Sequence, residues 1–206
     1  YAIGRYEIFP THGQWNFGTF ELDKHTDNMA AMQPSEIYEP GLYRVPQSGG
    51  SWWFDNIYQM NYFLEKVLPK LENGELEGDS RRLRHAIGEV YLMRAFAYFQ
   101  RLKLIGDFPI ITETLPDDQE ILSKHSKRRP RNEVARFILD DLDAAIDHLM
   151  SESPDGNRNR LSKKCAYLLK SRVALFEGTW LKYFKGTAFV PNGPDWPGSS
   201  KAYIQD

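Results

Sequence analysis

Residues 91–99 read Tyr-Leu-Met-Arg-Ala-Phe-Ala-Tyr-Phe, and residues 167–175 read Tyr-Leu-Leu-Lys-Ser-Arg-Val-Ala-Leu. Both stretches repeat apolar side chains at the spacing of one buried face of an α-helix. Their small residues let a neighbouring helix approach closely. The second stretch begins 76 residues after the first (from 91 to 167). We interpret them as equivalent helices of two αα-hairpins, which predicts an all-helical fold.

Caps and breakers bound the helices of these hairpins. Ser51 is the expected N-cap of the first helix, and the second runs from Asp79 or Ser80 to Gly106-Asp-Phe-Pro109, where glycine and proline end it. The other three predicted helices cover about 53–72, 131–150 and 162–183. The pattern predicts a degenerate tetratricopeptide-like solenoid that lacks the strict repeat of about 34 residues.

The rest of the chain is predicted to form loops. Residues 1–52 carry glycine or proline every few positions, and we expect a long loop-rich segment packed on the helical region 53–206. Both would belong to one larger domain truncated at its C-terminus. The connector 107–129 holds a basic run, Ser123-Lys-His-Ser-Lys-Arg-Arg129, which could be a nucleic-acid patch or a solvated loop. The net charge of −2 favours the solvated loop.

Composition excludes several classes of protein. A hydrophobic fraction of 41% suits a folded core, and a pI of about 6.3 gives no general attraction to nucleic acid. The single cysteine, Cys165, cannot form an internal disulfide, and its helical setting predicts a buried, inert thiol. No apolar run reaches the roughly 18 residues that a membrane-spanning helix needs.

A search for catalytic chemistry finds no nucleophile motif, phosphate-binding loop or zinc spacing among the scattered histidines. The acids of the third helix, Asp140, Asp141, Asp143 and Asp147, lack the pattern of a calcium loop and are expected mostly to face water. We therefore expect a non-enzymatic protein with no catalytic residues, no metal and no cofactor. A carboxylate pair brought together by the fold would be the hydrolase alternative, and no pair is singled out.

The candidate ligand site is centred on Trp52 and Trp53, at the junction of the loops with the first helix. Such a pair can staple the entry to the helix. Alternatively, one ring packs inward and the other is a platform on which the C–H face of a sugar stacks. The polar and aromatic residues that would complete a shallow glycan site are Asn56, Tyr43, Arg44, Asp27 and Asn28.

An ordered set of motifs between about 52 and 183 resembles the RagB/SusD family. The segments that carry the resemblance are Trp53-Phe-Asp-Asn-Ile-Tyr58 with Asn61-Tyr-Phe-Leu64, Gly88-Glu89 with Leu92–Phe99, Gly106-Asp-Phe-Pro109, Asp141-Leu-Asp-Ala-Ala-Ile146 and Leu175-Phe-Glu-Gly-Thr-Trp180. Met93, Val90 and Lys170-Ser171 depart from the family pattern at packing positions. The family's lipidated cysteine and long C-terminal half are missing from the sequence.

The resemblance implies a lipoprotein on the outward face of the outer membrane of Bacteroidetes-type bacteria. It would capture oligosaccharides or similar nutrients and deliver them to a TonB-dependent, SusC-like transporter. Membrane attachment would come only from an upstream lipid anchor that this chain lacks, and no nucleic acid would bind. The alternative is a tetratricopeptide-like adaptor for protein–protein interaction, which would have a polar concave groove and would bury both tryptophans.

Overall fold

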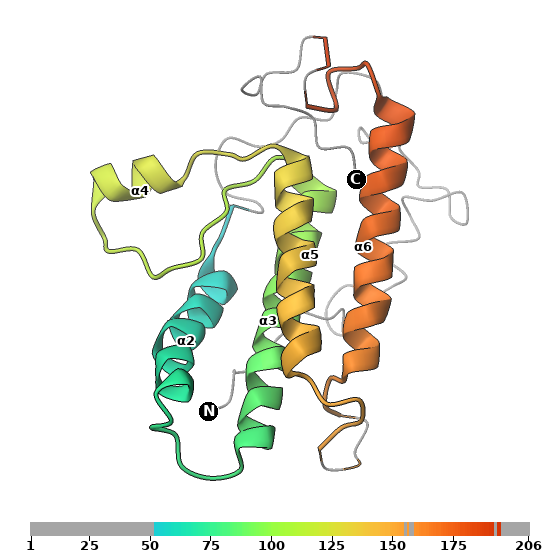
Figure 1. The fold of residues 1–206 in the computed structure, drawn as a ribbon. Helices are drawn as coiled ribbons and strands as arrows, with labels where there is room; N and C mark the ends of the chain where they lie inside the picture. The colour runs from blue at the N-terminus through green and yellow to red at the C-terminus, as the bar shows by residue number, and fades with distance from the viewer. Residues whose placement is uncertain (1–51, 155, 157–158, 192, 195–206) are drawn as a thin grey trace, which may run out of the picture. The chain divides into compact units, whose positions relative to one another are not determined.

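A computed structural model describes residues 52–154, 156, 159–191 and 193–194. Its helices, drawn in Figure 1, are α2 (Asp55–Glu72), α3 (Ser80–Ile105), α4 (Gln119–His125), α5 (Arg131–His148) and α6 (Lys163–Phe184). All of them lie in Trp53–Asp206, which is one compact unit. No strand occurs in the described ranges, so the all-helical prediction is confirmed.

The long helices form the two predicted αα-hairpins, α2 with α3 and α5 with α6, and Figure 1 shows the members of each pair side by side. The central helix is α3, because it packs on α2, α5 and α6. The buried apolar stripe of α3 includes Ile87, Val90, Tyr98 and Leu102, each at most 1% exposed. This stripe is the one predicted from periodicity, and its burial drives the hairpins together.

The helix boundaries agree with the sequence except at two places. Helix α2 begins at Asp55 with Phe54 as its N-cap residue, so the prediction that Ser51 caps it is wrong. The connector is also not wholly a loop, because α4 lies within it. The side chain of Asp118 caps α4 by accepting hydrogen bonds from the backbone N–H groups of Glu120 and Ile121. None of its seven residues is buried, so α4 has no apolar stripe to reveal it in the sequence.

Buried charges join the helices in ways that periodicity did not predict. Arg94 of α3 donates to both carboxylate oxygens of Asp141 on α5 (2.8 and 2.7 Å) and to Oδ1 of Asn61 on α2 (2.9 Å). Asp141 is therefore buried, and the expectation that it faces water is wrong for this one acid of its group. Arg131 forms an equally buried pair with Glu177 and links α5 to α6.

Helix α6 is covered on one side only. Ala166, Val173 and Glu177 are buried, whereas Leu168 and Leu175 are largely exposed. Cys165 also lies on the exposed surface, so the prediction of a buried thiol is wrong. The reason is that only one face of α6 meets another described helix, and Cys165 stands outside that face.

Candidate ligand-binding site at the start of helix α2

Trp53 directly precedes Phe54, the N-cap residue of α2, and is 63% exposed. Its backbone carbonyl accepts a hydrogen bond from Nη2 of Arg101 on α3 (3.4 Å), which holds the main chain while the ring stays accessible. Trp52 is only partly exposed. An accessible indole beside a backbone that is held in place can act as a stacking platform.

Phe54 anchors the entry to α2. Its ring stacks on Phe108 at the end of α3, with ring centroids 4.9 Å apart and an interplanar angle of 18°. One turn later Ile57 is 1% exposed, so the inward side of the helix start is filled by these apolar groups. Stapling therefore does not require Trp53 to turn inward, and its ring faces solvent.

The remaining predicted site residues are only partly placed. Asn56 is exposed in the first turn of α2, so its amide is available to a ligand. Tyr43, Arg44, Asp27 and Asn28 lie outside the described residues. The structure therefore brings Trp53 and Asn56 to the start of one helix, while the contribution of the loop residues stays a prediction.

A pocket that the sequence did not predict lies farther along α2. It has a volume of about 170 Å³ and is lined by Phe54, Ile57, Tyr58, Asn61, Ile111, Glu113, Leu115, Leu122 and Ser126. The amide of Asn61 donates to the carbonyl of Ile111 (2.8 Å), so that group is already engaged. The lining is mostly apolar, and it depends on the connector and on α4, which no periodic signal in the sequence revealed.

The described residues form neither a metal site nor a membrane-spanning helix. Within the described ranges, no group of three or more His, Cys, Asp and Glu side chains could hold a metal ion. None of the described helices combines the length and the apolar character needed to cross a membrane. The buried ion pairs of Arg94 and Arg131 join helices.

A model of a protein family matches most of the chain. The family, SusD-like, carries the description "Starch-binding associating with outer membrane", and the match covers residues 22–175. The match therefore spans the candidate site and three of the four long helices in full, and it reaches into α6.

Individual proteins give the same result. The SusD-like protein P25 of Formosa agariphila is 24% identical over 195 residues, which cover 87% of this chain and 36% of that protein. A crystal structure of a SusD-like protein from Bacteroides fragilis has 28% identity and a TM-score of 0.52, over 64% of this chain and 24% of that one. A laminarin-binding SusD-like protein has 25% identity and a TM-score of 0.52, over 63% of this chain and 27% of that one. The chain thus spans about a third of the curated relative and about a quarter of each solved chain.

Proposed function

This chain belongs to the SusD-like family, and on that basis we propose that it is part of a protein that captures oligosaccharides at the bacterial cell surface without altering them chemically. The family is associated with starch binding and the outer membrane, and one similar solved protein binds laminarin. Both ligands are glucans, whose pyranose rings expose flat C–H faces. Aromatic rings are suited to bind such faces.

The single observation that carries the proposal is the exposure of Trp53. The indole is 63% exposed, so its face is accessible to the C–H face of a sugar ring. Asn56 follows three residues later, and its exposed amide can donate to and accept from sugar hydroxyls. An adaptor of the tetratricopeptide type would instead bury both tryptophans, so the exposure of Trp53 favours glycan capture over that alternative.

We further propose the wider setting that the family suggests. The whole protein would sit on the outward face of the outer membrane, attached through a lipid upstream of this segment, and would pass its glycan to a TonB-dependent transporter. In this arrangement the helical hairpins are the rigid scaffold, and the start of α2 presents the ligand platform. No chemical step is assigned to any residue.

The test compares Trp53→Ala with a matched control, Tyr183→Ala, in binding to laminarin and to starch oligosaccharides. Tyr183 is also an exposed aromatic residue, at 75%, but it lies on α6 away from the proposed platform. Loss of a stacking anchor should weaken binding roughly five- to thirty-fold, equivalent to about 1–2 kcal/mol. The control should bind as the unchanged chain does.

Calorimetry would give the affinities, and circular dichroism would check the fold of both variants. Removing an exposed ring should change stability by no more than about 0.5 kcal/mol. Equal affinities for Trp53→Ala and the unchanged chain would overturn the assignment of the platform. Failure of the unchanged chain to bind either glucan would overturn the proposed ligand class.

A further inference from the structure

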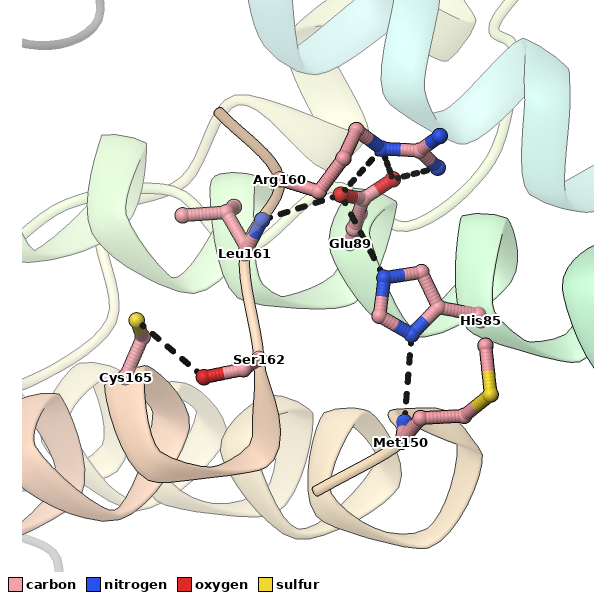
Figure 2. A network of polar contacts seen from close by, with 7 residues as sticks. All are labelled: His85, Glu89, Met150, Arg160, Leu161, Ser162 and Cys165. Carbon is pink, nitrogen blue, oxygen red and sulfur yellow. Dashed lines mark hydrogen bonds and ion pairs between the residues drawn. The ribbon is translucent and has the colours of Figure 1, made fainter. Parts of the chain in front are cut away.

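We propose that a proton-sensitive latch on α3, built from His85 and Glu89, holds the turn between α5 and α6, and that protonation of His85 opens it. The turn leaves α5 at Leu149 and Met150 and enters α6 at Ser162 and Lys163. Figure 2 shows the two latch residues on α3 facing both ends of this turn.

His85 holds the first end of the turn. Its side chain is fully buried (0% exposed), and Nδ1 accepts a hydrogen bond from the backbone N–H of Met150 (3.1 Å). An imidazole nitrogen that accepts a hydrogen bond carries no proton, so neutral His85 must carry its proton on Nε2. The geometry therefore selects one tautomer of the neutral ring.

Glu89, one helical turn farther along α3, holds the second end. Its carboxylate accepts hydrogen bonds from Arg160 Nε (2.8 Å) and Nη2 (2.6 Å) and from the backbone N–H of Leu161 (3.1 Å). The same carboxylate lies 3.6 Å from Nε2 of His85. The ends of the turn are also tied to each other, because the N–H of Lys163 donates to the carbonyl of Met150 (2.9 Å). The turn should consequently come away from α3 as a unit.

Protonation of His85 is incompatible with this arrangement. A proton on Nδ1 would point at the N–H of Met150, which places two donors face to face and removes the acceptor. The charged groups that face the ring are Glu89 on its own helix and Arg160 on the turn, and the backbone of Met150 meets it from the α5 side. Because Arg160 already pairs with Glu89, the carboxylate does not fully offset a buried imidazolium.

The burial of His85 and the charges around it also disfavour its protonated form. Burial lowers the pKa of His85 most strongly, and the charge of Arg160 lowers it further, while Glu89 acts in the opposite direction without reversing the shift. In the opened turn, the histidine regains water and titrates near its ordinary value of about 6.5. Acidification through that value therefore favours the open turn.

Opening should stay local. Just beside the latch, a Cβ placed on Gly88 would lie 2.8 Å from Cγ of Leu149 and 3.1 Å from the carbonyl oxygen of Ala145, so α3 and α5 are in close contact there. This contact does not involve the imidazole. We expect α3 and α5 to remain packed while the turn and the first residues of α6 separate from α3.

Hydrogen exchange of the Met150 and Leu161 amides tests the latch in the whole chain. When the pH falls from 7.5 to 5.5, the opening equilibrium should rise, by at most about tenfold, after correction for intrinsic exchange, because the open state gains a proton more readily. Amides in the middle of α3 should show no such rise. An unchanged opening equilibrium at Met150 and Leu161 would overturn the proposal.

His85→Gln is the decisive variant, since an amide oxygen can still accept from the Met150 N–H but does not titrate. The rise in opening should disappear in this variant and persist in the control His148→Gln, which alters a neighbouring partly buried histidine. A rise that survives in His85→Gln would overturn the latch. Should that variant fail to fold, ¹⁵N spectra of the unchanged chain decide, because a proton on Nδ1 at pH 7.5 would equally contradict the proposal.

Discussion

Arg94 is buried at the meeting point of three helices, and its guanidinium is fully used. Two of its nitrogens bind the carboxylate of Asp141, and a third donates to Asn61. The guanidinium also lies over the rings of Tyr91 and Phe137, each 5.4 Å away. Burial alone would lower the pKa of Arg94, but the hydrogen bonds and charge of Asp141 outweigh it and the net shift is upward. The arginine therefore stays charged, and its partner depends on it.

Replacing Arg94 by alanine should destabilise the fold by about 3–5 kcal/mol, because Asp141 would be left buried without a counter-charge. The control is Lys164→Ala, which breaks the exposed pair with Glu152 and should cost less than about 1 kcal/mol. Urea unfolding measures both values. Similar losses of stability in the two variants would mean that the buried ion pair of Arg94 contributes no more to stability than the exposed pair does.

The sequence could place Arg94 on the buried stripe of α3 but could not identify its partner. Helical periodicity is a property of one helix, whereas the Arg94–Asp141 contact depends on how α3 and α5 cross. Along the chain, Asp141 resembles Asp140, Asp143 and Asp147, which are exposed, and nothing in the sequence distinguishes it from them. The exposure of Trp53 is likewise not visible in the sequence, because the contact of its neighbour Phe54 with Phe108 joins segments far apart along the chain.

Gly88 and Gly178 both lie inside helices, but only Gly88 is in close contact with a neighbouring element. Gly88 lies where α3 closely approaches the end of α5, since an added Cβ would be 2.9 Å from the backbone nitrogen of Leu149. Gly178, in α6, has no heavy atom within 4 Å of the same position. Both glycines lie within resemblance motifs, so the sequence alone does not distinguish their roles.

Gly88→Ala should destabilise the protein by about 1–3 kcal/mol, because the helices must move apart to admit the methyl group. Gly178→Ala should instead stabilise it by roughly 0.5–1 kcal/mol through the higher helix propensity of alanine. Thermal unfolding of the two variants would show shifts of opposite sign. A stabilising Gly88→Ala would mean that the close approach of α3 and α5 is not required.

The helices themselves were predictable to within a few residues because they are long and carry apolar stripes. The exception, α4, is short and has no buried residue, so its only sequence signal was the Asp118 cap. The pocket that α4 helps to line was missed with it. Predictions from periodicity thus succeed for the scaffold and fail for the connector, where caps and single side-chain contacts fix the structure.

At the scale of the whole molecule, the scaffold and the ligand site differ in how far local sequence determines them. The hairpin order follows from four periodic segments, and the family match extends over the same region. The proposed site depends on which of two adjacent tryptophans faces outward and on residues of the segment 1–52, whose contribution stays a prediction. Repeated local signals in one sequence therefore suffice to predict the helical fold. The ligand contacts have to be established by experiment.

Acidification should destabilise the protein through His85, which is buried, and His148, which is partly buried. Burial lowers the pKa of His85, and it also lowers that of His148, where the charge of Arg84 adds to the effect and Asp147 opposes it. Both side chains therefore take up a proton less readily in the folded state than in the unfolded chain, where they titrate near pH 6.5. Their contribution is fully present above that pH and is lost as the pH falls below it, by up to about 1.4 kcal/mol per pH unit for each histidine.

Urea unfolding at pH 7.5 and 5.5 should show this as a fall of roughly 1–2 kcal/mol in the free energy of unfolding. The double variant His85→Gln/His148→Gln should have a flatter dependence over the same interval. Asp107 titrates with the opposite sign, because burial raises the pKa of its carboxyl, but it is retained in both proteins and cancels in the comparison. A double variant as acid-sensitive as the unchanged chain would assign the effect to other groups.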